Sequence, residues 1–229
     1  MTTKDDQRQA QGEQESVLCP KCGAENTVHP VHVIHGTREE GILKTLLKGD
    51  LNKHTCCVCQ NRFFLQFPVL FRDDADRYFV YFMPEQATDR EQAEKQAIVE
   101  DYFGDDEDTQ KPECRLAFSM RRFIEKVALY AQGFNDRLIE YVKYQMYQRK
   151  RDSIDPVRIE LLYDFSCEEK DKLRFLLFDR ETGQFQGAAH LPMDVYTELA
   201  STFNQNASMQ QELYNLFSDY DVNVDSLLP

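Results

Sequence analysis

The sequence predicts an α+β fold in which a small metal-binding part made of strands precedes a larger body of helices and strands. Two Cys-x-x-Cys pairs, Cys19/Cys22 and Cys56/Cys59, lie early in the chain, and aromatic strand patterns follow the second pair. Beyond residue 113, two helical patterns precede three strand patterns. At 229 residues, 41% of them hydrophobic, the chain is long enough to bury a core.

The chain is expected to begin with a disordered tail. Residues 1–16 are polar and lack apolar periodicity, so burial cannot repay the entropy of ordering them. We expect the fold to begin near Val17. Residues 17–84 are then assigned to an N-terminal zinc ribbon of rubredoxin-like type with a β-hairpin.

The predicted metal ligands are the four cysteines of the two pairs, Cys19, Cys22, Cys56 and Cys59. A Cys-x-x-Cys turn lets two thiolates reach one ion, and a second such turn completes the tetrahedral shell of a closed structural site. We therefore expect one structural Zn²⁺ ion without an open coordination position. Gly23 is expected to take a positive φ, and the second turn is expected to be more strained because Gln60 replaces this glycine.

The remaining elements of the ribbon follow from apolar spacing. Residues 26–35 show a strand pattern interrupted by proline, and residues 39–48 carry leucine and isoleucine at helical spacing. Two β-rich runs, 62–71 and 77–83, flank an aspartate-rich turn. We expect these two strands to complete the ribbon.

Residues 85–112 are expected to form a polar helix and an acidic linker between the two parts. The linker contains Asp105, Asp106 and Asp108, which could in principle hold a hard cation. The run lacks the closing glutamate of a twelve-residue calcium loop, so we interpret it as a solvated charged segment.

Residues 113–229 are expected to form an α+β C-terminal domain. It opens with a short strand at 113–119 and continues with a helical hairpin, whose helices cover 122–132 and 136–149. Gly133 ends the first helix, and Asn135 is expected to cap the second.

Three strands and closing helices complete this domain. The strand patterns cover residues 158–165, 172–178 and 184–190, with a turn at 181–183, and predict a small antiparallel sheet. Residues 191–217 are expected to supply one or two C-terminal helices that close the fold.

The other cysteines are interpreted as non-ligands. Cys57 is expected to be a small side chain beside two ligands, although a redox-sensitive thiol is an alternative. Cys114 and Cys167 lie in apolar runs and are expected to be core residues. A thiol-disulfide oxidoreductase is disfavoured, because Cys19 follows a polar tail rather than a core strand.

Four histidines near the cysteines allow alternatives to the four-thiolate site. The spacing of His29, His32 and His35 would suit a second metal site on a helix, but the local pattern predicts a strand, where such side chains lie on opposite faces. His54 could donate to a ligand sulfur or replace one, although four thiolates already fill the shell.

Charge and hydropathy limit the partners and the compartment. The formal charge is −13, from 40 acidic and 27 basic residues, which disfavours nucleic acids and anionic membranes. The best basic cluster is Lys143, Arg149, Lys150 and Arg151, which is also explained by the dipole at a helix end. The chain has no apolar run of about 20 residues and no secretory signal pattern, and its seven cysteines are an odd number. We expect no membrane association and a cytoplasmic protein.

Three functions remain open. The sequence shows no phosphate loop, nucleophile elbow or catalytic zinc motif, so we favour a non-enzymatic adaptor whose ribbon binds an unidentified protein partner. One alternative is a nucleic-acid or transcription-associated ribbon that uses the aromatic strands and the basic cluster. The other is an enzyme whose site in the C-terminal body is scattered in the sequence.

Several motifs are similar to those of one bacterial family. They are Cys19-Pro20-Lys21-Cys22-Gly23, the Gly49-Asp50-Leu51-Asn52 segment, Thr55-Cys56-x-x-Cys59, Pro68–Phe71, Phe123–Val127 and Gly133–Arg137 with Ile139, Glu140 and Lys143. The chain resembles the CpXC protein family, named for two Cys-Pro-x-Cys knuckles, over residues 17 to about 150. The resemblance implies the fold and the four metal ligands but no reaction. The chain departs from the family pattern at Cys57 and Gln60, which stand where the family has proline and glycine.

Overall fold

The computed structural model describes residues 14–36, 39–73, 75–84, 113–150, 153–217 and 220–228. It has mixed α and β structure, as predicted, and forms two compact units, Met1–Ile124 and Glu125–Pro229. The predicted polar helix and acidic linker at 85–112, including Asp105, Asp106 and Asp108, lie outside the described residues, as do residues 1–13 of the predicted tail. The domain boundaries expected from the sequence stay a prediction.

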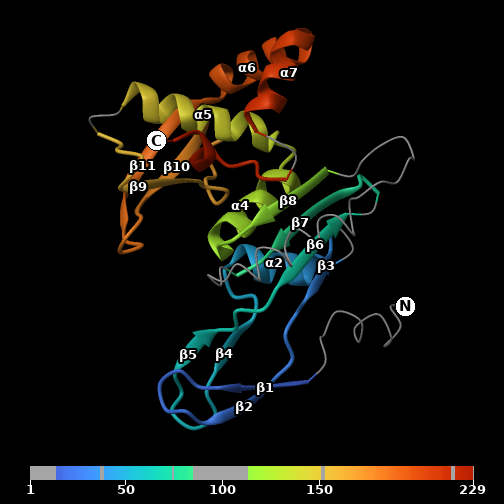
Figure 1. Cartoon of the computed structure of the whole chain (residues 1–229), viewed down its shortest axis with the longest axis vertical. Helices are drawn as coiled ribbons and strands as arrows, with labels where there is room; N and C mark the ends of the chain where they lie inside the picture. Colours follow the sequence, from blue (N-terminus) through green and yellow to red (C-terminus); the bar gives the residue numbers. More distant parts are fainter. Residues whose placement is uncertain are drawn as a thin grey trace. The chain divides into compact units, whose positions relative to one another are not determined.

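Two short hairpins in the first unit carry the cysteine pairs. β1 (Glu15–Leu18) pairs antiparallel with β2 (Glu25–Val28), and β4 (Lys53–Thr55) pairs antiparallel with β5 (Arg62–Phe64). The two hairpins lie side by side (Figure 1). β1 begins at Glu15, opposite Val28, and so includes two residues that the sequence assigned to the tail.

A four-stranded sheet and helix α2 (Glu40–Leu47) also belong to the described part of the first unit. The order of the sheet is β3-β6-β7-β8, and its strands are β3 (Val33–His35), β6 (Val69–Asp73), β7 (Tyr78–Phe82) and β8 (Glu113–Ala117). β6 and β7 are antiparallel, whereas β3 and β8 run parallel to their neighbours. Alternate residues of β6 and β7 are buried, as expected for strands with one face toward a core.

The prediction that the two aromatic strands complete the ribbon was wrong. The run 62–71 is two strands, β5 and β6, separated by the segment from Leu65 to Pro68. Leu65 donates its N–H to the carbonyl of Asn52 at 2.9 Å, and Pro68 has no N–H for a strand ladder. β5 alone therefore stays with the cysteine hairpins, and β6 and β7 enter the larger sheet.

Two helices follow β8 in the chain, and residues of both contribute to the core of the second unit. α4 (Met120–Ala131) contains the boundary between the units, and α5 (Asp136–Arg149) follows it as the predicted helical hairpin. Gly133 has a φ of 73° at the turn. The side chain of Asn135 accepts hydrogen bonds from the N–H groups of Arg137 and Leu138, at 3.0 and 3.3 Å, which confirms the predicted cap.

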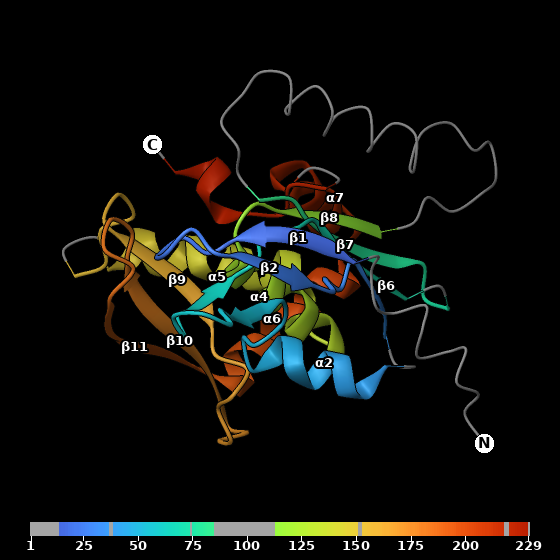
Figure 2. The same cartoon turned by 90° about the horizontal axis from the view of Figure 1, so that it is seen from below.

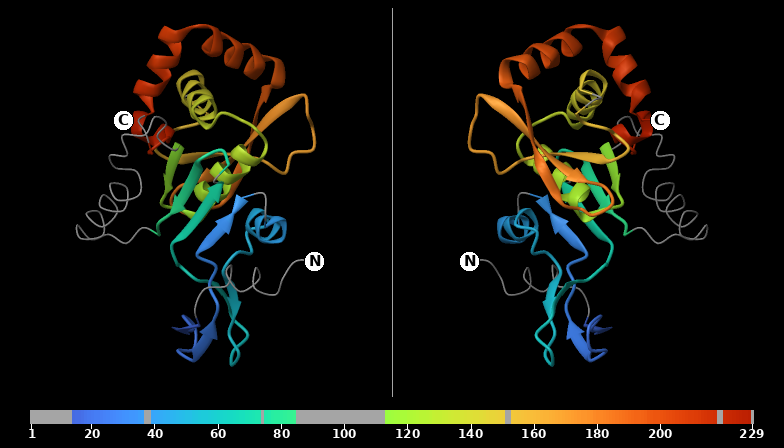
Figure 3. Two further views of the ribbon diagram at one scale, coloured as in Figure 1. Left: turned by 90° about the vertical axis from the view of Figure 1, so that its right-hand side faces the viewer. Right: turned by 90° about the vertical axis from the view of Figure 1, so that its left-hand side faces the viewer.

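The other elements of the second unit pack around α5. The antiparallel sheet has the order β11-β10-β9, from β9 (Ile159–Tyr163), β10 (Lys172–Asp179) and β11 (Phe185–Pro192), and α5 crosses one of its faces (Figure 2). Helices α6 (Met193–Gln205) and α7 (Ala207–Leu216) pack on the other side of α5 (Figure 3). The short 3₁₀ helix η2 (Val224–Leu227) ends the described chain. No described helix has the length and apolar character required to cross a bilayer.

Candidate metal centre

The two cysteine turns have the same backbone hydrogen bonds. In the first knuckle, Cys19–Cys22, the N–H of Cys19 donates to the carbonyl of Ala24 at 2.8 Å and Gly23 donates to Cys19 at 2.9 Å. In the second knuckle, Cys56–Cys59, Cys56 donates to Asn61 at 2.9 Å and Gln60 donates to Cys56 at 3.0 Å. The two turns therefore present their cysteines in the same way, although their sequences differ.

The residue after each second cysteine adopts a left-handed conformation. Gly23 has a φ of 69°, as predicted, and Gln60 has a φ of 58°. Such a conformation costs a residue with a Cβ roughly 1–2 kcal/mol, whereas glycine adopts it freely. The second knuckle is therefore the more strained of the two.

The structure brings the four predicted sulfurs together. The Sγ atoms of Cys19, Cys22, Cys56 and Cys59 all lie within 4.8 Å of one another. The sulfurs of Cys19 and Cys59 are 3.6 Å apart, and those of Cys22 and Cys56 are 3.7 Å apart. Four sulfurs about 2.3 Å from a central ion occupy a tetrahedron with an edge of about 3.8 Å. The cluster can therefore hold one metal ion with modest adjustment.

Backbone N–H groups favour a thiolate at the first cysteine of each knuckle. The N–H of Cys59 is the main cause that lowers the pKa of Cys56 to about 6, with a further contribution from Val58 at 3.4 Å. Burial opposes ionisation of Cys19, but the N–H groups of Cys22 and Lys21 outweigh it and lower its pKa. These oriented dipoles would also disperse the charge of bound thiolates.

The pKa of the Cys22 thiol is instead raised. The N–H of Ala24 lowers its pKa, but the neighbouring Cys59 thiol, together with the partial loss of hydration at the sulfur, raises it more, to about 12. A cation among the sulfurs would reverse this effect, because a metal ion deprotonates the thiols that bind it.

Asn26 connects the two knuckles, and the sequence analysis missed it. Its side chain is buried, and its Nδ2 donates to the carbonyl of Ala24 at 2.7 Å and lies 3.8 Å from the sulfur of Cys56. Its Oδ1 accepts the N–H of Cys57 at 3.0 Å. An asparagine in a short strand pattern carries no signal of this role, because its partners in the second knuckle, Cys56 and Cys57, are about thirty positions away.

The histidines take other partners. His54 Nε2 lies 3.4 Å from Asn26 Oδ1, and its ring contacts Phe63 edge to face. His32 lies within hydrogen-bond distance of Glu15 and of the carbonyl of Pro68. Across the described residues, the four cysteines form the group of potential ligands that could hold a metal, so the structure does not bring His29, His32 and His35 together as a second site.

The remaining cysteines divide into one buried residue and two accessible ones. Cys114 is buried in β8, as predicted, and burial raises its pKa to about 12. Cys57 is exposed at the knuckle surface. The prediction that Cys167 is a core residue was wrong: it is partly exposed, because it follows Asp164 in a polar turn beyond the end of β9.

The predicted basic cluster does not form as one surface. Lys143 is fully buried and pairs with Glu125 and Glu140, at 2.7 and 2.8 Å. Arg149 and Lys150 are exposed at the end of α5, whereas Arg151 lies outside the described residues. The cluster therefore lacks one of the side chains expected to contact a nucleic acid.

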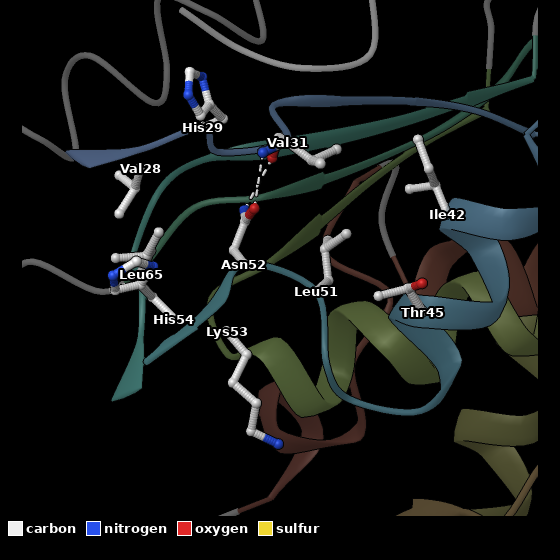
Figure 4. A pocket seen from close by; sticks show the side chains of 10 residues that line it. All are labelled: Val28, His29, Val31, Ile42, Thr45, Leu51, Asn52, Lys53, His54 and Leu65. Carbon is white, nitrogen blue, oxygen red and sulfur yellow. Dashed lines mark hydrogen bonds between the residues drawn. The ribbon is translucent and has the colours of Figure 1, made fainter. Parts of the chain in front are cut away.

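A pocket of about 300 Å³ lies beside the second hairpin, between α2 and the segments that flank β2 and β4 (Figure 4). Several of its polar groups have partners within the protein: the amide of Asn52 bonds the backbone of Val31, Thr45 donates to Gly41, and Lys53 pairs with Asp50. The wall is otherwise largely apolar. Its residues are Val28, His29, Val31, Ile42, Thr45, Leu51, Asn52, Lys53, His54 and Leu65.

The family model of the CpXC protein matches residues 17–143 of this chain. The match includes both knuckles, the four-stranded sheet and α4, and it ends within α5. The chain belongs to the CpXC family. In this CpXC protein, Cys57 and Gln60 stand where the first knuckle has Pro20 and Gly23, yet the second knuckle keeps the hydrogen bonds of the first. None of the curated proteins and none of the solved structures compared matches the chain.

Proposed function

We propose that this CpXC protein is a non-enzymatic cytoplasmic protein in which one structural Zn²⁺ ion holds a rubredoxin-like ribbon together, and that the ribbon presents a surface to a protein partner. The observation that carries the proposal is the approach of four cysteine sulfurs within 4.8 Å. Four thiolates fill the tetrahedral shell of zinc and leave no position for a substrate or an activated water. Thiolate donors also favour zinc over hard cations such as Mg²⁺ or Ca²⁺.

The surface of the hairpins supports a binding role. Leu18 and Val58 are each 69% exposed, and Phe64 is 46% exposed, and all three belong to the two hairpins or their knuckles. Apolar side chains around a rigid metal centre are suited to an interface, because little conformational entropy is lost when they are covered.

Protein capture with matched variants tests this role. The tagged full-length protein is cross-linked in its own cells, and contacts are mapped by mass spectrometry for the wild type, for Val58→Ser and for Val157→Ser. Val157 is the control because it is as exposed as Val58, at 69%, but lies in the second unit. We expect Val58→Ser to reduce cross-links to the partner several-fold and Val157→Ser to leave them unchanged. Turnover of a substrate by the pure metal-loaded protein, or equal effects of the two variants, would contradict the proposal.

A further inference from the structure

Five charged side chains are buried together in the second unit. Glu125 and Lys126 lie on α4, and Asp136, Glu140 and Lys143 lie on α5; all five are between 0 and 6% exposed. Burying an ion costs several kcal/mol unless nearby charges and hydrogen bonds compensate it. The contacts of each side chain therefore determine whether it is ionised in the folded protein.

Each lysine joins two carboxylates. Lys143 Nζ lies 2.7 Å from Glu125 Oε1 and 2.8 Å from Glu140 Oε1, and Lys126 Nζ lies 3.3 Å from both Glu140 Oε1 and Asp136 Oδ2. The carboxylates also accept backbone donors: Glu125 Oε1 accepts the N–H of Tyr163 in β9. The cluster thus joins the helical hairpin to the sheet.

Glu140 also connects the same cluster to η2, near the C-terminal end of the described residues. Its Oε2 accepts the N–H of Val224 in η2 at 3.0 Å, and Val224 is itself buried in the core of the unit. Both oxygens of Glu140 therefore have donors, two lysines on one and a backbone N–H on the other.

Glu125 differs from Glu140 in its second oxygen. Within the described part of the chain, Glu125 Oε2 is a buried side-chain oxygen with no hydrogen-bond partner. A buried charged oxygen without a donor is costly, because it has lost its hydration and gained nothing in return.

The charges of the cluster do not balance. Within the ion pairs that join these five described residues, three acidic and two basic side chains leave one negative charge in excess. The charged groups that act on Glu125 are Lys143 and Glu140 on α5 and Lys126 on α4. The guanidinium of Arg137 lies over the ring of Tyr214 at 4.3 Å, and its Nε donates to the carbonyl of Phe217, on the side of α5 that faces α7.

We propose that Glu125 is a buried proton-binding site, which carries a proton on Oε2 in the folded protein at neutral pH. The proton makes the five-residue cluster neutral and removes charge from the oxygen that has no donor, while Oε1 continues to accept Lys143 and Tyr163. Burial, followed by the negative charge of Glu140, raises the pKa of Glu125, and Lys143 and Lys126 only partly oppose this. Unfolding exposes the carboxyl to water and releases the proton.

This proton couples the stability of the second unit to pH. A carboxyl whose pKa is raised by folding stabilises the fold below its unfolded pKa, and this contribution is lost as the pH rises toward the folded pKa. Between those two values the unfolding equilibrium constant should increase about tenfold per pH unit from this one group.

Infrared spectroscopy of the full-length wild-type protein at pH 7 tests the proposal directly. We expect the C=O stretching band of a protonated carboxylic acid, absent from Glu125→Gln and retained in the control Asp164→Asn, which changes a buried carboxyl of the second unit that pairs with Arg174 outside the cluster. The measurement on the wild type does not depend on whether a variant folds. Absence of the band at pH 7, or its persistence in Glu125→Gln, would overturn the proposal.

Urea unfolding followed at β9 to β11 gives a second, independent readout. Glutamine has the size of glutamic acid and is always neutral, so Glu125→Gln should fold and should lose the tenfold-per-unit component of the pH dependence over the range above the ordinary pKa of a glutamate. Glu140→Gln should instead weaken the unit throughout this range, because two lysines lose their shared charge. An identical pH slope in the wild type and Glu125→Gln would contradict the assignment.

Discussion

The second knuckle holds Gln60 in the left-handed region, where the first knuckle has Gly23. We predict that Gln60→Gly stabilises the metal-loaded protein by up to about 1 kcal/mol, because relief of the backbone strain exceeds the entropy that glycine adds to the unfolded chain. Thermal unfolding of the metal-loaded protein measures the change.

The matched control is Gly23→Gln. No atom lies within 4 Å of the position of a Cβ at Gly23, so the new side chain meets no obstacle and the backbone conformation alone should cost about 1 kcal/mol. A gain in stability for Gly23→Gln, or a loss for Gln60→Gly, would contradict the claim that the left-handed conformation at this position strains a residue with a Cβ.

The amide of Asn26 is the other residue-scale feature that holds the knuckles together. Asn26→Ala removes the acceptor for the N–H of Cys57 and the donor to Ala24. We expect the affinity for zinc to fall roughly 10–100-fold, as for other residues that orient metal ligands. Competition with a chromophoric chelator measures the affinity. Asn61→Ala is the control, since Asn61 contributes its backbone carbonyl to the second knuckle; equal losses in both variants would refute a specific role for Asn26.

Cysteine spacing predicted the residues that meet at the centre, because a Cys-x-x-Cys turn is a local structure that four residues determine. Asn26 and the buried position of Lys143 were missed for the opposite reason. Asn26 accepts a hydrogen bond from Cys57 in the other knuckle, and Lys143 pairs with Glu125 on the preceding helix, so these contacts carry no local signal in the sequence.

At the scale of elements, α5 follows the predicted bounds from Asp136 to Arg149, because its cap and its apolar spacing are both local signals. The Asn135 cap can be tested by Asn135→Ala, which leaves the N–H groups of Arg137 and Leu138 without their acceptor. We expect a loss of about 1 kcal/mol in the unfolding free energy of the second unit.

Denaturant unfolding followed by a probe in the second unit measures this loss. Asn135→Ser is the matched variant, since a serine hydroxyl can accept the same bonds and should restore most of the stability. No difference between the alanine and serine variants would contradict a capping role.

Strand partners were less accessible to sequence reasoning than strand positions. The patterns located β6, β7 and β8, but the parallel pairing of β3 with β6 and of β7 with β8 joins segments separated by more than thirty residues. The break between β5 and β6 has a local signal in Pro68. The pairing of β6 with β3 and β7, rather than with the cysteine hairpins, has no such signal.

At the scale of the whole molecule, the metal centre belongs to one unit and the buried charge cluster to the other. We predict that removal of the metal by a strong chelator abolishes hydrogen-exchange protection in β1, β2, β4 and β5, because these short hairpins depend on the sulfurs for their attachment. β9 to β11 should keep their protection, since the core of the second unit contains none of the four cysteines.

Hydrogen exchange of the full-length protein, read by mass spectrometry before and after chelation, separates these outcomes. The sheet of β3, β6, β7 and β8 should respond less than the hairpins, because Ile34, Val69, Phe71 and Val80 supply it with a buried core of its own. Equal loss of protection in all strands, or no loss in the hairpins, would contradict a local role for the metal.

The most direct test is elemental analysis of freshly purified full-length protein, combined with thiol quantification. The four sulfurs that lie within 4.8 Å predict one zinc ion per chain in the wild type and in Cys57→Ser, and a marked loss of zinc in Cys59→Ser. A wild type that contains no stoichiometric metal, or in which Cys19, Cys22, Cys56 and Cys59 are joined as disulfides, would contradict the metal centre and the function proposed from it.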